Sequence, residues 1–175
     1  MLTEDQVKWI NHLSATNKTI ITPYNPKSKI LFKKQKTELH KILGKDITIV
    51  HRGASNLGIS GKGELDIYIP VPVDKFDELL AKLIHAYGEP GSLYSLERAR
   101  FNRKVDGVIA EVFLINEEAE GWKQGLVFEE YLRSHPDELQ RYERLKETLN
   151  GLSTREYYRR KIKYFNEILV KAKFQ

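Results

Sequence analysis

Apolar residues recur at helical spacing most clearly between residues 74 and 86. They fall on one face of a helix and indicate a side buried against other elements: Phe76, Leu79, Leu80, Leu83 and Ile84. Pro90 and Gly91 follow this stretch, and both residues are typical of a turn. The pattern therefore predicts an amphipathic helix over residues 74–86.

Other helices are predicted on both sides of this one. Thr3 and Gln6 have the spacing of a capping box, in which each side chain bonds the backbone of the other, at the start of a short N-terminal helix. Gly44 and Gly151 each follow an apolar periodic stretch, where glycine commonly ends a helix. Further helices are expected at residues 30–43, 125–134, 136–149 and 155–171.

Strands are predicted where β-branched and alternating apolar residues occur, at residues 47–52, 64–70, 98–104 and 108–115. Asp106 and Gly107 separate the last two strands and have the composition of a hairpin turn. The order helix, strand, strand, helix, strand, strand, helices predicts an α+β fold with a mixed sheet of at least four strands.

The same order predicts the organisation of the chain. Residues 1–22 are expected to be an N-terminal helix and linker, residues 23–124 an α/β core with helices flanking the sheet, and residues 125–175 a C-terminal helical subdomain.

Composition excludes several kinds of site. The chain of 175 residues has 41% hydrophobic and 30% charged residues, which is typical of a globular protein. It has no cysteine, so disulfides, thiolate metal sites and cysteine nucleophiles are excluded. The acidic N-terminus lacks a signal-peptide pattern and no apolar run is long enough to span a bilayer, so we expect a cytoplasmic protein without a membrane partner.

Two carboxylates at the start of the second strand are the first candidate for chemistry. Glu64 and Asp66 point to the same face because side chains alternate along a strand. Such a pair repels itself unless a cation lies between the two groups. The glycine-rich loop before it, residues 53–63, offers backbone N–H groups to phosphate. Turns of this kind are also common without a ligand, and a solvated Glu-x-Asp is the other interpretation.

The order strand, Gly53-Ala54-Ser55, loop, Glu64-x-Asp66 resembles the nucleotidyltransferase (DNA polymerase β-like) superfamily. More narrowly, the chain resembles the GrpB family over about residues 20–172. The landmarks of this resemblance are Pro23-Tyr24-Asn25-Pro26, Phe32, His51-Arg52-Gly53-Ala54-Ser55, Gly61-Lys62-Gly63-Glu64-Leu65-Asp66-Ile67, Tyr131-Leu132-Arg133-Ser134-His135-Pro136, Tyr142 and Lys146.

The resemblance implies a Mg²⁺- or Mn²⁺-dependent enzyme that uses a nucleoside triphosphate. It implies that Glu64 and Asp66 bind the metal, with a third carboxylate on a later strand. Glu111 is the candidate for that role, because a carboxylate within an apolar strand is costly to bury unless it is paired; an edge position facing water is the alternative. Gly53, Ala54 and Ser55 would bind the nucleotide.

Two departures from the family pattern leave it undecided which residues form the metal site. Ala54 stands where the family has serine, and the loop is one residue shorter. If the alignment is anchored on Lys62, Asp66 becomes the first carboxylate and Tyr68 takes the second position, where it would be a poor ligand. A sequence partner that could activate Ser55 as a nucleophile is not evident.

Basic side chains near the carboxylates are candidates for phosphate binding. Arg98, Arg100 and Arg103 lie on the strand before Glu111, and the planar guanidinium matches phosphate oxygens. Lys62 ends the loop. Surface charges on an outer strand and a solvated loop lysine are the alternatives.

Three hypotheses follow. The first is a nucleotidyltransferase that acts on an unknown acceptor, which could be a small molecule, RNA or protein. The second is a catalytically inactive nucleotide-binding or scaffold protein of the same fold. The third is an RNA-binding module that uses the basic C-terminal helix, which the net charge of +5 permits without requiring it.

Overall fold

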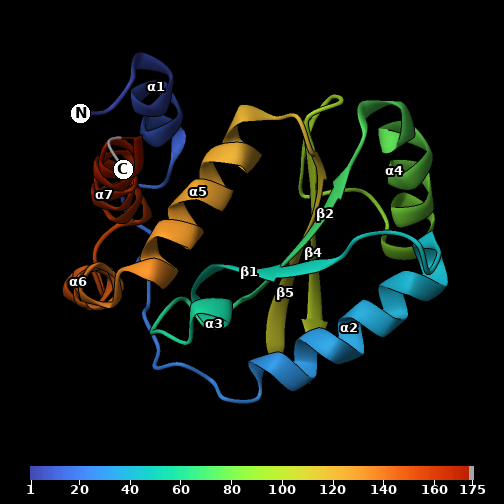
Figure 1. Cartoon of the computed structure of the whole chain (residues 1–175), viewed down its shortest axis with the longest axis horizontal. Helices are drawn as coiled ribbons and strands as arrows, with labels where there is room; N and C mark the ends of the chain where they lie inside the picture. Colours follow the sequence, from blue (N-terminus) through green and yellow to red (C-terminus); the bar gives the residue numbers. More distant parts are fainter. Residues whose placement is uncertain (174–175) are drawn as a thin grey trace. The chain divides into compact units, whose positions relative to one another are not determined.

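The computed structural model of the chain describes residues 1–173 and divides into two compact units. The first unit comprises Met1–Pro23, Ile59–Lys62 and residues 124–173, and the second comprises Tyr24–Gly58 and Gly63–Lys123 (Figure 1). Every helix of the described chain is too short or too polar to cross a membrane.

The second unit is built on a five-stranded sheet with the order β1-β2-β5-β4-β3. Its strands are β1 (Val50–Arg52), β2 (Leu65–Val71), β3 (Ser92–Tyr94), β4 (Arg98–Val105) and β5 (Val108–Asn116). Strands β2 and β5 are parallel and the other neighbours are antiparallel. The predicted α+β fold with a mixed sheet is therefore confirmed. Strand β3 was not predicted, and β1 is shorter than expected.

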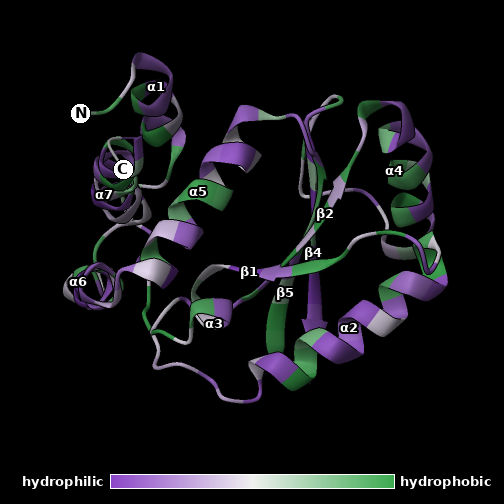
Figure 2. Cartoon of the chain, viewed as in Figure 1, coloured by the Kyte–Doolittle hydropathy of each residue, from purple (hydrophilic) through white to green (hydrophobic). Residues whose placement is uncertain are grey.

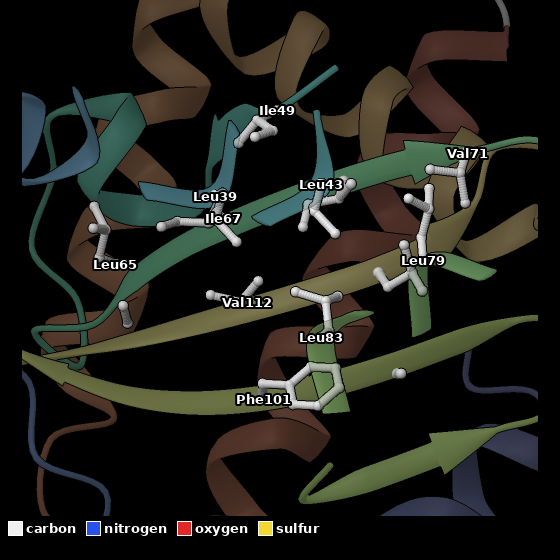
Figure 3. Close-up of a cluster of buried hydrophobic side chains, with 14 of the residues drawn as sticks. Leu39, Leu43, Ile49, Leu65, Ile67, Val71, Leu79, Leu83, Phe101 and Val112 are labelled. Atoms are coloured by element: carbon white, nitrogen blue, oxygen red, sulfur yellow. The ribbon is translucent and has the colours of Figure 1, made fainter. Parts of the chain in front are cut away.

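One face of the sheet is covered by α2 (Ser28–Leu43) and α4 (Val73–Tyr87). Figure 3 shows Leu39 and Leu43 of α2 and Leu79 and Leu83 of α4 gathered over the apolar side chains of the strands. Both helices alternate apolar and polar bands along their length (Figure 2). Burying each such leucine contributes roughly 1.5–3 kcal/mol, so this face contributes substantially to the stability of the unit.

Alternation along β2 assigns its residues to two faces. Leu65, Ile67, Ile69 and Val71 are buried in the core beneath the helices. Asp66 and the other intervening residues therefore lie on the opposite face of the sheet. The sequence predicted this alternation, and the second face carries charged side chains, with Asp66 among them.

The hairpin between β4 and β5 has the predicted turn. Asp106 and Gly107 both have positive φ, 48° and 85°. This is the conformation of a type I′ turn, which matches the twist of the two strands. The local turn chemistry thus sets the register in which Arg100 and Phe113 are strand partners.

The first unit contains α1 (Glu4–His12), α6 (Pro136–Thr148), α7 (Thr154–Lys173) and most of α5 (Glu120–Ser134). The capping box of Thr3 and Gln6 is present at the start of α1. Helices α1 and α7 are in contact, and Trp9 packs edge-on against Tyr158 with ring centroids 5.3 Å apart.

Residues 59–62 belong to the first unit although their neighbours in the chain belong to the second. Thr22 and Gly61 pair their backbones, with N···O distances of 2.7 and 3.0 Å. The backbone N–H of Ser60 donates to Glu143 Oε1 at 2.8 Å, and Lys146, which is 2% exposed, donates to the Ser60 carbonyl. These bonds hold residues 59–62, which form the second half of the glycine-rich loop that leads into β2.

Candidate metal and nucleotide site

Three carboxylates converge on the face of the sheet opposite α2 and α4. One oxygen from each of Glu64, Asp66 and Glu111 lies within 4.8 Å of the other two, and all three residues are partly buried. The structure therefore brings together the three carboxylates that were predicted as metal ligands.

Strand pairing explains this convergence. Asp66 of β2 and Glu111 of β5 are register partners in the parallel pair, so their side chains point to the same side of the sheet. Glu64 precedes β2 by one residue and is two residues from Asp66. The cluster depends on β2 and β5 being neighbours, which the sequence did not specify.

The glycine-rich loop, residues 53–63, begins against this cluster. Residues Gly53–Leu57 form a short helix, α3, where an irregular loop was expected. Gly53 has a φ of +73°, and a Cβ built on it would lie 1.9 Å from Asp66 Oδ2. Only glycine permits this approach of the backbone to the carboxylate. Gly58 then ends the helix in the left-handed conformation.

Ser55 has a partner that sequence reasoning missed. Its hydroxyl lies 2.9 Å from His51 Nε2, and the side chain is 8% exposed. The His51 ring stacks on Phe32 of α2, with centroids 4.9 Å apart. His51 is the strand partner of Ile67, which belongs to the core face. This contact ties α3 to the core face of the sheet.

Tyr68 is part of an aromatic row on the same face as Asp66. Its ring stacks on Phe113, with centroids 4.5 Å apart, and on Trp122, with centroids 5.6 Å apart. Glu64, and not Tyr68, completes the carboxylate cluster with Asp66. Of the two residues that the alternative alignments pair with Asp66, Glu64 places an oxygen in the cluster and Tyr68 packs its ring against Phe113 and Trp122.

The three arginines of β4 divide between the two faces of the sheet. Arg100 Nη1 donates to Glu111 Oε1 at 3.1 Å. The Arg98 guanidinium carbon lies 4.9 Å from the Tyr94 ring centroid and 6.0 Å from that of Phe113. Arg103 is strand partner to Ala110 and lies over the ring of Tyr87, a residue of α4. Arg98 and Arg100 thus belong to the face of the cluster, whereas Arg103 does not.

Lys62 lies in the first unit, where its ammonium is 5.8 Å from the ring centroid of Tyr158. It is the last residue of the segment 59–62, which Glu143 and Lys146 hold at Ser60.

Arg52 is a charged residue of this face that sequence reasoning did not single out. It is the strand partner of Asp66 in the pair β1–β2, is 8% exposed, and has its guanidinium carbon 5.0 Å from the Trp122 ring centroid. A buried arginine beside clustered carboxylates offsets part of their mutual repulsion. Its position at the end of an apolar strand, directly before Gly53, was the available signal.

The donor set fits a hard divalent cation. Carboxylate oxygens are the ligands that Mg²⁺ and Mn²⁺ prefer, and three of them from separate residues leave positions for water and phosphate. Arg100 Nε is buried and has no hydrogen-bond partner within residues 1–173. This unsatisfied donor beside Glu111 suits a site that receives an anionic ligand.

Comparisons with known proteins agree with this architecture. The family model described as GrpB protein matches residues 18–171. This match confirms the resemblance that the sequence landmarks indicated. A search of curated proteins gave no match.

Solved structures with a similar fold include the conserved protein GrpB from Enterococcus faecalis. It has a TM-score of 0.67 and 20% identity, over 87% of this chain and 96% of that chain. A Cid1 poly(U) polymerase with bound MgGTP has a TM-score of 0.48 and 11% identity, over 82% and 45%. A cytoplasmic RNA terminal U-transferase has a TM-score of 0.42 and 13% identity, over 82% and 46%.

Proposed function

This chain belongs to the GrpB family, and we propose that it is a divalent-cation-dependent nucleotidyltransferase. It would transfer a nucleoside monophosphate from a nucleoside triphosphate to an acceptor that is a small molecule, RNA or protein. The convergence of Glu64, Asp66 and Glu111, with oxygens within 4.8 Å of one another, is the observation that carries this proposal.

The carboxylate cluster would hold the cation. Glu64, Asp66 and Glu111 supply three negative charges that repel one another until a cation balances them. A bound Mg²⁺ or Mn²⁺ ion would act as a Lewis acid that stabilises charge on the transferring phosphoryl group. Arg52 stands beside the cluster, where it would limit the repulsion before the cation binds.

The triphosphate would lie between the start of α3 and strand β4. The backbone at Gly53, Ala54 and Ser55 is a candidate for binding the β- and γ-phosphates, because no side chain separates Gly53 from Asp66. Arg98 and Arg100 present guanidinium groups on the same face of the sheet.

The transfer itself is a substitution at the α-phosphorus. The acceptor hydroxyl oxygen would form the new bond to that phosphorus, and the bond to the bridging oxygen would break. Pyrophosphate would leave, and the hydroxyl proton would pass to solvent. The chain contributes by holding the reacting groups in line.

A catalytically inactive nucleotide-binding or scaffold protein is the second candidate. Ala54 supplies no hydroxyl, and the hydroxyl of Ser55 is engaged by His51. In addition, Arg100 occupies one oxygen of Glu111. These features favour a protein that binds nucleotide without transferring it.

Calorimetry with ATP, GTP, CTP and UTP in the presence of Mn²⁺ tests nucleotide binding. We expect heat from at least one of them, with an affinity that falls as salt rises. Arg98→Ala should weaken binding about tenfold through loss of a charge-assisted hydrogen bond. Arg103→Ala, on the other face of β4, is the matched control and should bind as the wild type does. Folded protein that gives no heat with any of the four would refute the nucleotide proposal.

Release of pyrophosphate separates the two candidates. The tightest-binding nucleotide is incubated with Mg²⁺ and with RNA, small alcohols or protein as acceptor. Release that requires an acceptor and disappears in Asp66→Asn supports the transferase. Binding without release under every condition supports the inactive protein.

A further inference from the structure

The ion pair between Arg100 and Glu111 involves a residue from each of two proposed binding functions. Arg100 is a candidate phosphate ligand and Glu111 a candidate metal ligand, yet in this structure Nη1 donates to Oε1 at 3.1 Å. The Arg100 side chain is 36% exposed and that of Glu111 is 12% exposed. The arginine side of the pair is therefore open to water, while the carboxylate is mostly enclosed.

Arg100 is also incompletely satisfied. A guanidinium has five N–H donors, and its Nε is buried without a hydrogen-bond partner in the part of the chain that is described. Arg52 differs, because it is buried and its guanidinium lies over Trp122. Of the two arginines near the carboxylates, Arg100 is the one placed to change partners.

We propose that Arg100 exchanges Glu111 for a phosphate oxygen when a divalent cation engages Glu111. This inference rests on the proposed function. A doubly charged compact ion attracts the carboxylate more strongly than a delocalised single charge does. The released guanidinium then donates to the triphosphate, whose several oxygens match its fork. Arg100 thereby becomes available as a nucleotide ligand only after the cation has bound.

Cation and nucleotide are then coupled through one side chain. A cation alone competes with Arg100 for the Glu111 carboxylate, and the nucleotide alone finds Arg100 bound to Glu111. Each ligand therefore improves the affinity for the other by the same factor.

A double-mutant cycle in EDTA tests the exchange without any metal. The affinity for the tightest-binding nucleoside triphosphate is measured for the wild type, Arg100→Gln, Glu111→Gln and the double variant. Glu111→Gln releases Arg100 and should tighten binding about tenfold, which is one charge-assisted hydrogen bond. In the Arg100→Gln background the same change should tighten binding by no more than about threefold, because only charge repulsion is removed.

Arg103→Gln is the matched control for the cycle. Arg103 lies on the same strand but over Tyr87 of α4. In its background, Glu111→Gln should keep the full tenfold gain. If Glu111→Gln increases the nucleotide affinity equally in the Arg100→Gln and wild-type backgrounds, only the removal of charge repulsion acts. That result would overturn the exchange.

Mn²⁺ binding without nucleotide is a second, independent readout. Electron paramagnetic resonance counts the free ion directly, and Arg100→Gln should bind Mn²⁺ several-fold more tightly because a competitor for Glu111 is gone. Unchanged Mn²⁺ affinity in folded Arg100→Gln would also overturn the exchange. If no triphosphate binds to wild type even with Mn²⁺, the proposed function fails. If it binds and the cycle is additive, only the exchange fails.

Discussion

Gly53 and Asp66 approach so closely that no side chain fits between them. A Cβ on Gly53 would lie 1.9 Å from Asp66 Oδ2 and 2.9 Å from its Cγ. The glycine also has a φ of +73°, which other residues rarely adopt. The backbone that begins α3 and the Asp66 carboxylate of β2 therefore lie directly against each other.

Gly53→Ala should move the Asp66 carboxylate and impair the cation site. We expect a loss of stability of about 1–2 kcal/mol from the left-handed backbone alone, and a further loss from the collision with Asp66. Mn²⁺ affinity should fall at least tenfold, as measured by electron paramagnetic resonance.

Gly58→Ala separates backbone strain from the collision. Gly58 has a φ of +75°, close to that of Gly53, but a Cβ there would meet no atom of the described chain within 4 Å. This variant should lose a similar amount of stability from strain and keep its affinity for Mn²⁺. Equal loss of Mn²⁺ binding in both variants would contradict the role of the Gly53–Asp66 approach.

Asp66→Asn distinguishes a metal ligand from a structural carboxylate. Three carboxylates repel in the absence of metal, so the amide should leave the melting temperature of the metal-free protein unchanged or slightly higher. Mn²⁺ should raise the melting temperature of the wild type and not that of the variant, because the amide oxygen carries no charge. A destabilised variant, together with a wild type indifferent to Mn²⁺ even with nucleotide, would indicate a structural Asp66.

Lys146→Met tests how the segment 59–62 is held. The buried ammonium of Lys146 donates to the Ser60 carbonyl and lies 4.8 Å from the Tyr142 ring centroid. Methionine keeps the apolar stem and removes the donor, so the free energy of unfolding should fall by about 1.5–3 kcal/mol. Urea denaturation measures this loss, and hydrogen exchange should increase at the amides of Ser60 and Gly61.

Lys163→Met is the control, because Lys163 lies at an exposed position of a helix. Its unfolding free energy should stay within about 0.5 kcal/mol of the wild type. If Lys146→Met is equally harmless, the buried lysine does not hold the segment.

Acid should weaken the contact between α6 and α7. The Lys171 ammonium, 2.5 Å from Glu138 Oε1, lowers the pKa of Glu138, and Arg141 lowers the pKa of Glu167. Because the folded-state pKa values lie below the usual 4.5, the stabilisation is complete above that value and is lost as pH falls through the folded-state values. The melting temperature should therefore drop below about pH 4.5.

Glu138→Gln should reduce this fall in melting temperature at acid pH (the acid limb of the curve), because the neutral amide has no proton to gain. The exposed Glu89 lies in the other unit, and Glu89→Gln should leave the limb as it is in the wild type. Melting curves between about pH 3 and 7 make the comparison. An unchanged limb in Glu138→Gln would show that other carboxyl groups control acid unfolding.

Local patterns in the sequence determined the elements whose stabilisation is itself local. The apolar face predicted for residues 74–86 is the buried face of α4, with Phe76 and Leu83 in the core. Asp106 and Gly107 specified the hairpin turn through their backbone conformations. Alternation along β2 placed Asp66 opposite Leu65 and Ile67, because the period of a strand does not depend on its neighbours.

Short elements and the contacts that depend on them could not be predicted from the sequence. Strand β3 has three residues, and two of them are exposed, so it lacks an apolar pattern of its own and exists through its pairing with β4. Helix α3 has five residues and little periodicity to detect. The hydrogen bond between the side chains of Ser55 and His51 joins residues four positions apart, and Ser55 was expected to lie in an irregular loop.

Only the tertiary structure decided which distant residues meet. The pairing of β2 with β5 places Glu111 beside Asp66, and the antiparallel register of β4 places Arg100 beside Glu111. Tertiary contacts also assign residues 59–62 to the unit that contains Lys146. The physical reason is that periodicity along a chain gives the face on which a side chain lies, whereas the partner across that face depends on strand order and register, which the burial of the whole core selects.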